Sequence, residues 1–106
     1  MRRLGLLLLL ACGRPLPVTT GDACEEASAA RCDRGIACGT TSSTTRAGCI
    51  TANVAACCAE RGKCRTDSSD PYAARRCTDA FAVQGCGQWG NAVLPAECVG
   101  IPDMWQ

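Results

Sequence analysis

Cysteine is the residue type whose number and spacing in this sequence point most directly to chemistry. The 106 residues include eleven cysteines. An odd number leaves one thiol without a partner inside the chain. Cys12 differs from the rest because it follows a run of leucines that ends in Ala11. If Cys12 carries a separate modification, the others can form five disulfides. These ten are Cys24, Cys32, Cys38, Cys49, Cys57, Cys58, Cys64, Cys77, Cys86 and Cys98.

The N-terminus has the layout of a secretory signal peptide. Arg2 and Arg3 precede the apolar segment Leu4–Ala11, which ends in a small residue. This segment is far too short to span a bilayer as a helix, which takes about 20 apolar residues. Unbroken leucine after two arginines is also a poor pattern for a buried strand or helix. We therefore expect residues 1–11 to be a signal peptide that is removed on export.

The end of this segment, Leu9-Leu10-Ala11-Cys12, resembles the lipobox of bacterial lipoproteins. The resemblance implies that the thiol of Cys12 receives a diacylglyceryl group, that the signal is cut before Cys12 and that the new amino terminus is acylated. Gly13 is not the aspartate that holds many lipoproteins at the inner membrane, so delivery to the outer membrane is implied. The alternative is an ordinary cleaved signal with an incidental Cys12, which would give a secreted protein.

The other cysteines lack the spacing of metal or redox sites. The sequence contains no Cys-x-x-Cys or Cys-x-Cys, so zinc ribbons and thioredoxin-like motifs have no candidate here. It also contains no histidine, which removes Ser-His and Cys-His nucleophiles and histidine-containing metal sites. We predict no catalytic residue, no cofactor and no metal. The adjacent pair Cys57-Cys58 could be a redox-active vicinal disulfide, but we favour two cysteines that reach different partners.

Composition indicates a small domain that needs covalent support. The chain has one Phe, one Tyr and two Trp, too few for a large apolar core. Small domains with thin cores often depend on disulfides, each worth about 2–4 kcal/mol. A chain this rich in cysteine is typical of an oxidising compartment. We expect one domain over residues 22–106, joined to lipidated Cys12 by a flexible tether at residues 12–21.

Charge gives little information about partners. The chain has 11 basic and 10 acidic residues. No basic stripe suggests nucleic acid, and no polybasic cluster suggests anionic lipid. Glu25 and Glu26 could be acid/base carboxylates, but adjacent helical residues point about 100° apart. We interpret these two glutamates, and also the basic pair Arg75 and Arg76, as solvated charges.

Two helices are predicted in the first half of the domain. Asp22 can cap the first, with Glu25 three residues later as in a capping box, and Gly35 can end it. The second helix follows the polar loop at residues 39–45, begins after a hydroxyl cap and ends at Gly62. The expected ranges are Asp22–Arg34 and about Thr45–Arg61.

A third helix has the clearest boundaries. Asp70 is a suitable N-cap, Pro71 suits the first helical position, and Gly85 follows Gln84 as a stop. From Cys86 onward, glycine and proline recur too often for another long helix. We therefore expect an irregular C-terminal segment, packed locally through Trp89, Val93 and Leu94.

Helical spacing predicts which faces are buried and two of the disulfides. If the first two helices form an antiparallel hairpin, the start of each lies beside the end of the other. Cys24 should then join Cys57 or Cys58, and Cys32 should join Cys49; the other pairings stay open. The expected buried stripes are Cys24, Ser28 and Cys32 in the first helix, Cys49, Asn53, Ala56 and Cys57 in the second, and Ala73, Cys77, Ala80, Phe81 and Gln84 in the third.

The cysteine framework from Asp22 to Cys98 resembles small cysteine-rich exported proteins and lipoproteins of uncharacterised function from gliding, predatory soil bacteria. The resemblance rests on Cys24-x7-Cys32-x5-Cys38, Cys49-x7-Cys57, and the later Cys77, Cys86 and Pro95-Ala96-Glu97-Cys98. Cys58 and Cys64 are additional to that pattern and are candidates for an extra bridge. The plant lipid-transfer framework also has a Cys-Cys pair, but it requires a Cys-x-Cys that is absent here.

Together these observations predict an all-α, small disulfide-rich domain of three short helices with an irregular C-terminal segment. We expect a non-enzymatic cell-envelope protein, held to the membrane by lipid on Cys12, with a structural role or contacts to envelope proteins. One alternative is a module that binds a small apolar ligand or lipid, which a pocket lined by Phe81, Val83, Val93 and Leu94 would favour. Another is a secreted inhibitor or toxin-like effector, which would present a rigid loop at residues 39–45 or 61–70.

Overall fold

The computed structural model describes residues 15–39, 45–59, 62–87 and 94–101. Within these ranges the chain forms the helices α2 (Thr20–Ala37), α3 (Arg46–Cys57) and α4 (Pro71–Ala82), with two short 3₁₀ turns, η1 (Lys63–Arg65) and η2 (Ala96–Cys98). No strand occurs in the described ranges; the β-type pairing there is an isolated bridge between Thr19 and Asp67. The predicted all-α, disulfide-rich domain of three helices is confirmed.

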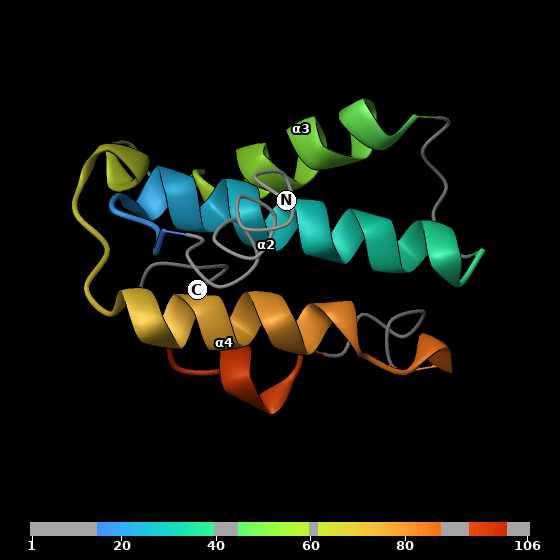
Figure 1. Cartoon of the computed structure of the whole chain (residues 1–106). Helices are drawn as coiled ribbons and strands as arrows, with labels where there is room; N and C mark the ends of the chain where they lie inside the picture. Colours follow the sequence, from blue (N-terminus) through green and yellow to red (C-terminus); the bar gives the residue numbers. More distant parts are fainter. Residues whose placement is uncertain (1–14, 40–44, 60–61, 88–93, 102–106) are drawn as a thin grey trace, which may run out of the picture.

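Helix α2 is the centre of the domain. Figure 1 shows α3 on one side of α2 and α4 on the other, with η2 against the outer face of α4. Helix α3 runs antiparallel to α2, and the chain then returns through η1 to the start of α2, so that α4 runs in the same direction as α2. Every described contact between two long helices therefore involves α2.

The start of α2 differs from the prediction. The N-cap is Thr19, and Asp22 occupies the N3 position of the capping box. The Thr19 hydroxyl accepts from the Asp22 amide at 3.0 Å, and the Thr19 amide donates to the Asp22 carboxylate at 3.2 Å. Asp22 is thus the reciprocal partner of a cap rather than the cap itself, because a threonine three residues earlier offers the better-placed hydroxyl.

This earlier start also moves the domain boundary. Residues 15–21, assigned to a flexible tether, belong to the folded domain, because Pro17 is buried and the backbone pairs with the segment before α4. The Thr20 amide donates to the Thr66 carbonyl at 2.8 Å, and the Ser68 amide donates to the Val18 carbonyl at 2.9 Å. The predicted signal peptide at residues 1–11 and the first tether residues, including Cys12, lie outside the described residues.

The ends of the helices also differ from the predicted ones. Helix α2 continues through buried Gly35 to Ala37, and the chain turns at Gly39, which has a φ of +66°. Helix α3 stops at Cys57 rather than continuing to Arg61, since Cys58 leaves the helix to pair with Cys64. Helix α4 stops at Ala82, two residues before its predicted end.

The predicted starts of α3 and α4 agree with the structure. The Thr45 hydroxyl caps α3 by accepting from the Gly48 amide at 3.0 Å. The Asp70 carboxylate caps α4 by accepting from the Ala73 amide at 3.0 Å, and Pro71 is the first helical residue.

The core consists mainly of small side chains. Six of the eleven buried hydrophobic residues are cysteines, three are alanines, and only Phe81 and Ile101 are larger. Arg31 covers the Phe81 ring with its guanidinium 5.7 Å from the ring centre, and its partial burial lowers the pKa of Arg31. A domain of this kind has little apolar area to stabilise it.

The predicted buried stripes are partly correct. All three expected α2 residues are buried, as are Cys49 and Cys57 in α3 and Cys77, Phe81 and Gln84 near α4. Ala56 is exposed and Asn53 only half-buried, because the short α3 touches α2 on one narrow face. In α4 the inward face contains Ala74 and Thr78 in place of Ala73 and Ala80, which are half-buried. This is the face that shares helical spacing with Cys77 and Phe81.

Phe81 provides the most direct test of this core. Phe81→Ala should lower the free energy of unfolding by about 3–5 kcal/mol, because it empties the largest buried side chain in the described domain. Tyr72→Ala is the matched control: Tyr72 lies on the same helix with 66% of its surface exposed, and exposed substitutions usually change stability by less than about 0.5 kcal/mol. Guanidinium unfolding with the disulfides intact measures both. Equal losses in the two variants would contradict the assigned core.

Candidate functional site

Five disulfides join all the described helices and turns. They are Cys24–Cys57, Cys32–Cys49, Cys38–Cys86, Cys58–Cys64 and Cys77–Cys98. Their Cα–Cα distances lie between 4.7 and 5.9 Å, the normal range for a bridge. All ten cysteines after Cys12 are therefore paired.

The two disulfides between α2 and α3 are the pairs that the antiparallel hairpin predicts. Cys32 joins Cys49, and of the two candidates for Cys24 the partner is Cys57. Cys58 instead joins Cys64, so the adjacent cysteines do reach different partners. The pairings Cys38–Cys86 and Cys77–Cys98 were left open by the sequence, because they depend on how the irregular C-terminal segment returns to α2 and α4.

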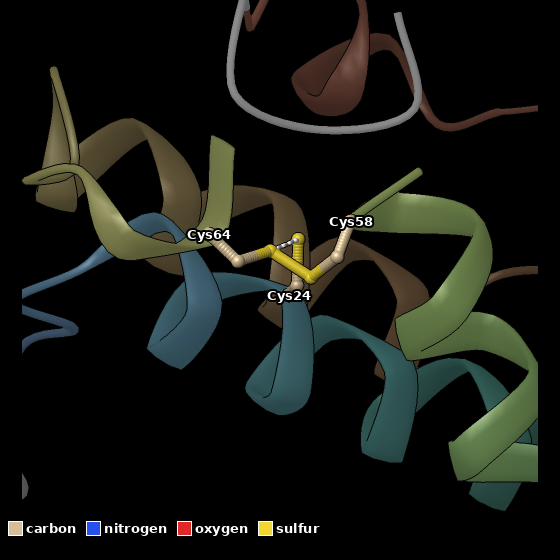
Figure 2. Close-up of side chains that lie close together, drawn as sticks. All are labelled: Cys24, Cys58 and Cys64. Atoms are coloured by element: carbon tan, nitrogen blue, oxygen red, sulfur yellow. Dashed lines mark hydrogen bonds between the residues drawn. A yellow bond between two sulfur atoms is a disulfide. The ribbon is translucent and has the colours of Figure 1, made fainter. Parts of the chain in front are cut away.

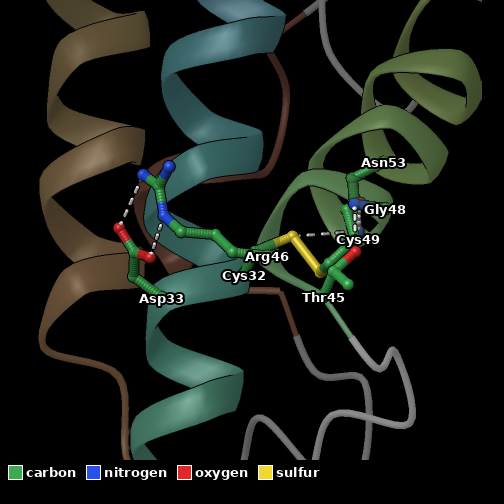
Figure 3. The surroundings of a disulfide bond; sticks show 7 residues. All are labelled: Cys32, Asp33, Thr45, Arg46, Gly48, Cys49 and Asn53. Atoms are coloured by element: carbon green, nitrogen blue, oxygen red, sulfur yellow. Dashed lines mark hydrogen bonds and ion pairs between the residues drawn. A yellow bond between two sulfur atoms is a disulfide. The ribbon is translucent and has the colours of Figure 1, made fainter.

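The Cys32–Cys49 bridge lies in a polar setting (Figure 3). The Asn53 side-chain amide donates to the Cys49 carbonyl at 2.9 Å and lies 3.5 Å from the Cys32 sulfur. Next to it, Arg46 at the start of α3 forms a two-point ion pair with Asp33 of α2, with a shortest distance of 2.6 Å. The Arg46 hydrogen bond lowers the pKa of Asp33, and the Asp33 hydrogen bond raises the pKa of Arg46. Both side chains are more than half exposed, so the pair adds little to stability.

Two disulfides touch at the other end of the hairpin (Figure 2). We call Cys24, Cys57, Cys58 and Cys64 the sulfur cluster. The Cys64 sulfur lies 3.8 Å from the Cys24 sulfur although the two belong to different bridges. Because disulfide sulfurs carry no hydrogen, this is a van der Waals contact. The sulfurs of Cys24, Cys58 and Cys64 all lie within 4.8 Å of one another.

The sulfur cluster has a buried bridge and an outer bridge. Cys24 and Cys57 are 0% and 1% exposed, whereas Cys58 and Cys64 are only half-buried. A cysteine binds a metal ion as a thiolate. In the described state all four sulfurs are in disulfides, so none of them is a thiolate. The sequence did not predict this cluster, because Cys64 reaches Cys24 only through the return of the chain at η1.

Gly21 makes this return possible. A Cβ atom placed on Gly21 would lie 2.8 Å from the Cys64 carbonyl oxygen, closer than real Cβ contacts allow. The first turn of α2 therefore needs a glycine for η1 to lie against it. Gly62, with a φ of +79°, provides the turn into η1.

A shallow groove of about 460 Å³ lies between α2 and α4. Alanine methyl groups line part of it, and polar or charged residues line the rest: Ala29, Ala30, Ala37, Ala82, Thr78, Glu26, Asp33, Arg34, Arg46 and Asp79. Several of these charges already have partners. Asp33 binds Arg46, and the Arg34 guanidinium donates to the Gln84 carbonyl at 2.6 Å. The groove is thus lined by both acidic and basic side chains.

Glu26 and Arg75, at the edge of this groove, differ from the prediction. The sequence predicts solvated charges here, but the two residues form a two-point ion pair between α2 and α4 with a shortest distance of 2.6 Å. Their side chains are only 21% and 17% exposed. Hydrogen bonding to Glu26 raises the pKa of Arg75, which also donates to the Pro15 carbonyl. Sequence could not show this pair because the partners lie 49 positions apart; Glu25 and Arg76 are exposed, as expected.

The described residues of the pocket that would favour an apolar ligand lie in different places. Phe81 is 1% exposed and belongs to the core. Val83 and Leu94 border a smaller groove of about 270 Å³, together with polar Gln84 and Glu97. Val93 lies outside the described residues. In the part of the chain that the structure describes, no helix has the length and apolar character needed to cross a membrane.

Comparison with known proteins adds no family to this picture. The chain matches no protein-family model, no curated protein and no solved structure at a significant level. The site must therefore be interpreted from its own chemistry.

The Asp33–Arg46 ion pair beside the Cys32–Cys49 bridge should make the stability of the domain depend on pH. Since the pKa of Asp33 is lowered in the folded protein, the pair contributes stability above the unfolded pKa of about 4. That contribution is lost as the pH falls through the folded pKa. Arg46→Gln should raise the Asp33 titration midpoint, measured by NMR of the carboxyl carbon, because it removes the hydrogen bond that lowers this pKa. Arg76→Gln removes an exposed arginine from α4 and should leave the midpoint low. An equal midpoint in wild type and Arg46→Gln would contradict the assignment.

Proposed function

We propose that this chain is an exported, lipid-anchored protein of the bacterial cell envelope, with a non-enzymatic structural or protein-interaction role. The observation that carries the proposal is the pairing of all ten cysteines after Cys12. This leaves Cys12 as the odd thiol of the sequence, at the position where the lipobox resemblance requires a lipidated cysteine. Five disulfides also fit an oxidising compartment outside the cytoplasm.

The short connection to Cys12 supports a role close to the membrane. Pro15, three residues after Cys12, is held against α4 by the hydrogen bond that Arg75 donates to its carbonyl. Three residues span at most about 11 Å, so a lipid on Cys12 would hold the domain at the bilayer surface. We infer that any partner of the domain also lies at that surface, within the envelope.

The grooves favour interaction through a rigid surface over storage of an apolar ligand. The larger groove is bordered by two ion pairs: Glu26–Arg75 joins α2 to α4, and Asp33–Arg46 joins α2 to α3. Phe81, one of the side chains of the pocket that would favour an apolar ligand, lies in the core. A secreted inhibitor or effector with the same rigid domain would differ from the proposed protein in carrying no lipid on Cys12.

The lipid anchor can be tested in the full-length chain. Cys12→Ser should abolish incorporation of a labelled fatty acid, because it removes the acceptor sulfur, and it should release the protein from the membrane fraction. Gly13→Asp is the matched control: it keeps the thiol, should keep the label, and by the lipoprotein rule should retain the protein at the inner membrane. Label that persists in Cys12→Ser would contradict the anchor.

The interaction role has its own readout in the same cells. Chemical cross-linking of intact cells should join the wild-type domain to envelope proteins, and Cys12→Ser should lose these products because the domain leaves the surface. A lipidated wild-type protein that gives no cross-linked product would contradict the interaction role while leaving the anchor intact.

A further inference from the structure

We propose that the sulfur cluster is a disulfide-exchange relay, in which reduction of the outer Cys58–Cys64 bridge is passed to the buried Cys24–Cys57 bridge. The products are a new Cys24–Cys64 bridge and two neighbouring thiols on Cys57 and Cys58. This activity goes beyond the anchoring role and does not depend on it. The reductant is a dithiol, such as a thioredoxin-like protein or a small dithiol compound.

The contact between the two bridges makes the exchange possible. The Cys64 sulfur needs to move only from its 3.8 Å contact to bonding distance of Cys24. Figure 2 shows the two sulfurs facing each other, with the Cys58–Cys64 bridge crossing next to Cys24. None of the other bridges places a sulfur in such a cluster within the described residues.

Accessibility determines which bridge reacts first. An external dithiol can reach half-buried Cys58 and Cys64, whereas Cys24 and Cys57 are almost fully buried. The outer bridge also closes a loop with a sequence separation of only 6, so it restrains the unfolded chain less than the longer bridges do. Opening it leaves α2 and α3 joined by two bridges, Cys24–Cys57 and Cys32–Cys49.

The chemistry proceeds in two balanced steps. In the first, the dithiol loses two electrons and two protons to become a disulfide, and Cys58 and Cys64 become thiols. In the second, the Cys64 thiolate attacks the Cys24 sulfur, the Cys64–Cys24 bond forms, the Cys24–Cys57 bond breaks, and Cys57 leaves as a thiolate that takes up a proton. The second step is an exchange with no net change in oxidation state.

The surrounding charges identify the attacking thiol. Lys63 and Arg65 flank Cys64 in η1, and positive charge beside a thiol favours its thiolate, the attacking form. Cys57 and Cys58 lie at the C-terminal end of α3, where the negative end of the helix dipole favours neutral thiols. Of the two thiols that opening the outer bridge releases, Cys64 is therefore the better nucleophile.

Partial reduction of the purified oxidised protein tests the relay. One equivalent of a phosphine, which becomes the phosphine oxide, should open the outer bridge at acidic pH, where thiolate exchange is slow. Immediate alkylation should then label Cys58 and Cys64. After a shift to neutral pH before alkylation, the label on Cys64 should move to Cys57 while Cys58 stays labelled. Peptide mapping by mass spectrometry should find the Cys24–Cys64 bridge. Label that stays on Cys58 and Cys64 would overturn the proposal.

Three variants separate the relay from general disulfide shuffling. Cys58→Ser leaves one unpaired thiol, which should be found on Cys57 as well as on Cys64; a thiol found only on Cys64 would overturn the proposal. Cys86→Ser is the matched control, because it leaves Cys38 unpaired at the far end of α2. The free thiol of this variant should stay on Cys38.

Gly21→Ala should slow the transfer, since the added methyl group pushes the Cys64 backbone away from α2. Equal rates in wild type and Gly21→Ala would contradict the role of the contact.

Discussion

The buried contacts that join α2 to its neighbours consist largely of sulfur and methyl groups. Apart from Phe81 and Ile101, no buried hydrophobic side chain among the described residues is larger than cysteine. Apolar burial stabilises by about 25 cal/mol per Å², so such a core gives limited stability to a domain of this size. The disulfides supply the missing constraint because they connect the helices to one another and to the turns. Two join α2 to α3, and one joins the end of α2 to the segment after α4. One joins α4 to η2, and one joins the end of α3 to η1.

The noncovalent contacts complement this network. Glu26–Arg75 joins α2 to α4, an interface with no direct disulfide between the two helices, and the capping box of Thr19 and Asp22 begins α2 where the returning chain pairs with it. The same return brings Cys64 against Cys24. A cross-link that holds the end of α3 therefore also lies in contact with a second cross-link, which is the basis of the proposed exchange.

Sequence reasoning was accurate where one local feature determined the structure. Thr45 is the last hydroxyl residue before α3, and Asp70 directly precedes Pro71, so the starts of α3 and α4 were predicted. The i, i+4, i+8 spacing of Cys24, Ser28 and Cys32 gave the buried face of α2 and two disulfides. It failed where two local signals competed, as when Thr19 took the cap assigned to Asp22. It also failed where a disulfide determined a helix end: α3 stops at Cys57 because Cys58 pairs with Cys64.

The candidate site was less predictable than the fold, because it depends on tertiary contacts. The sulfur cluster needs the close approach of η1 to Gly21, and the Glu26–Arg75 pair needs α4 to run alongside α2. Neither is visible in residue spacing. The odd cysteine count, by contrast, was informative from the sequence alone, because pairing of the ten cysteines in the domain leaves Cys12 over.

The cross-links, rather than apolar packing, keep these helices folded. Far-ultraviolet circular dichroism of the domain before and after complete reduction and alkylation, together with a count of free thiols in the oxidised protein, measures this dependence. We predict no free thiol among Cys24–Cys98 before reduction and loss of most of the helical signal after it. A reduced, alkylated domain that keeps its helicity and unfolds cooperatively would contradict the account.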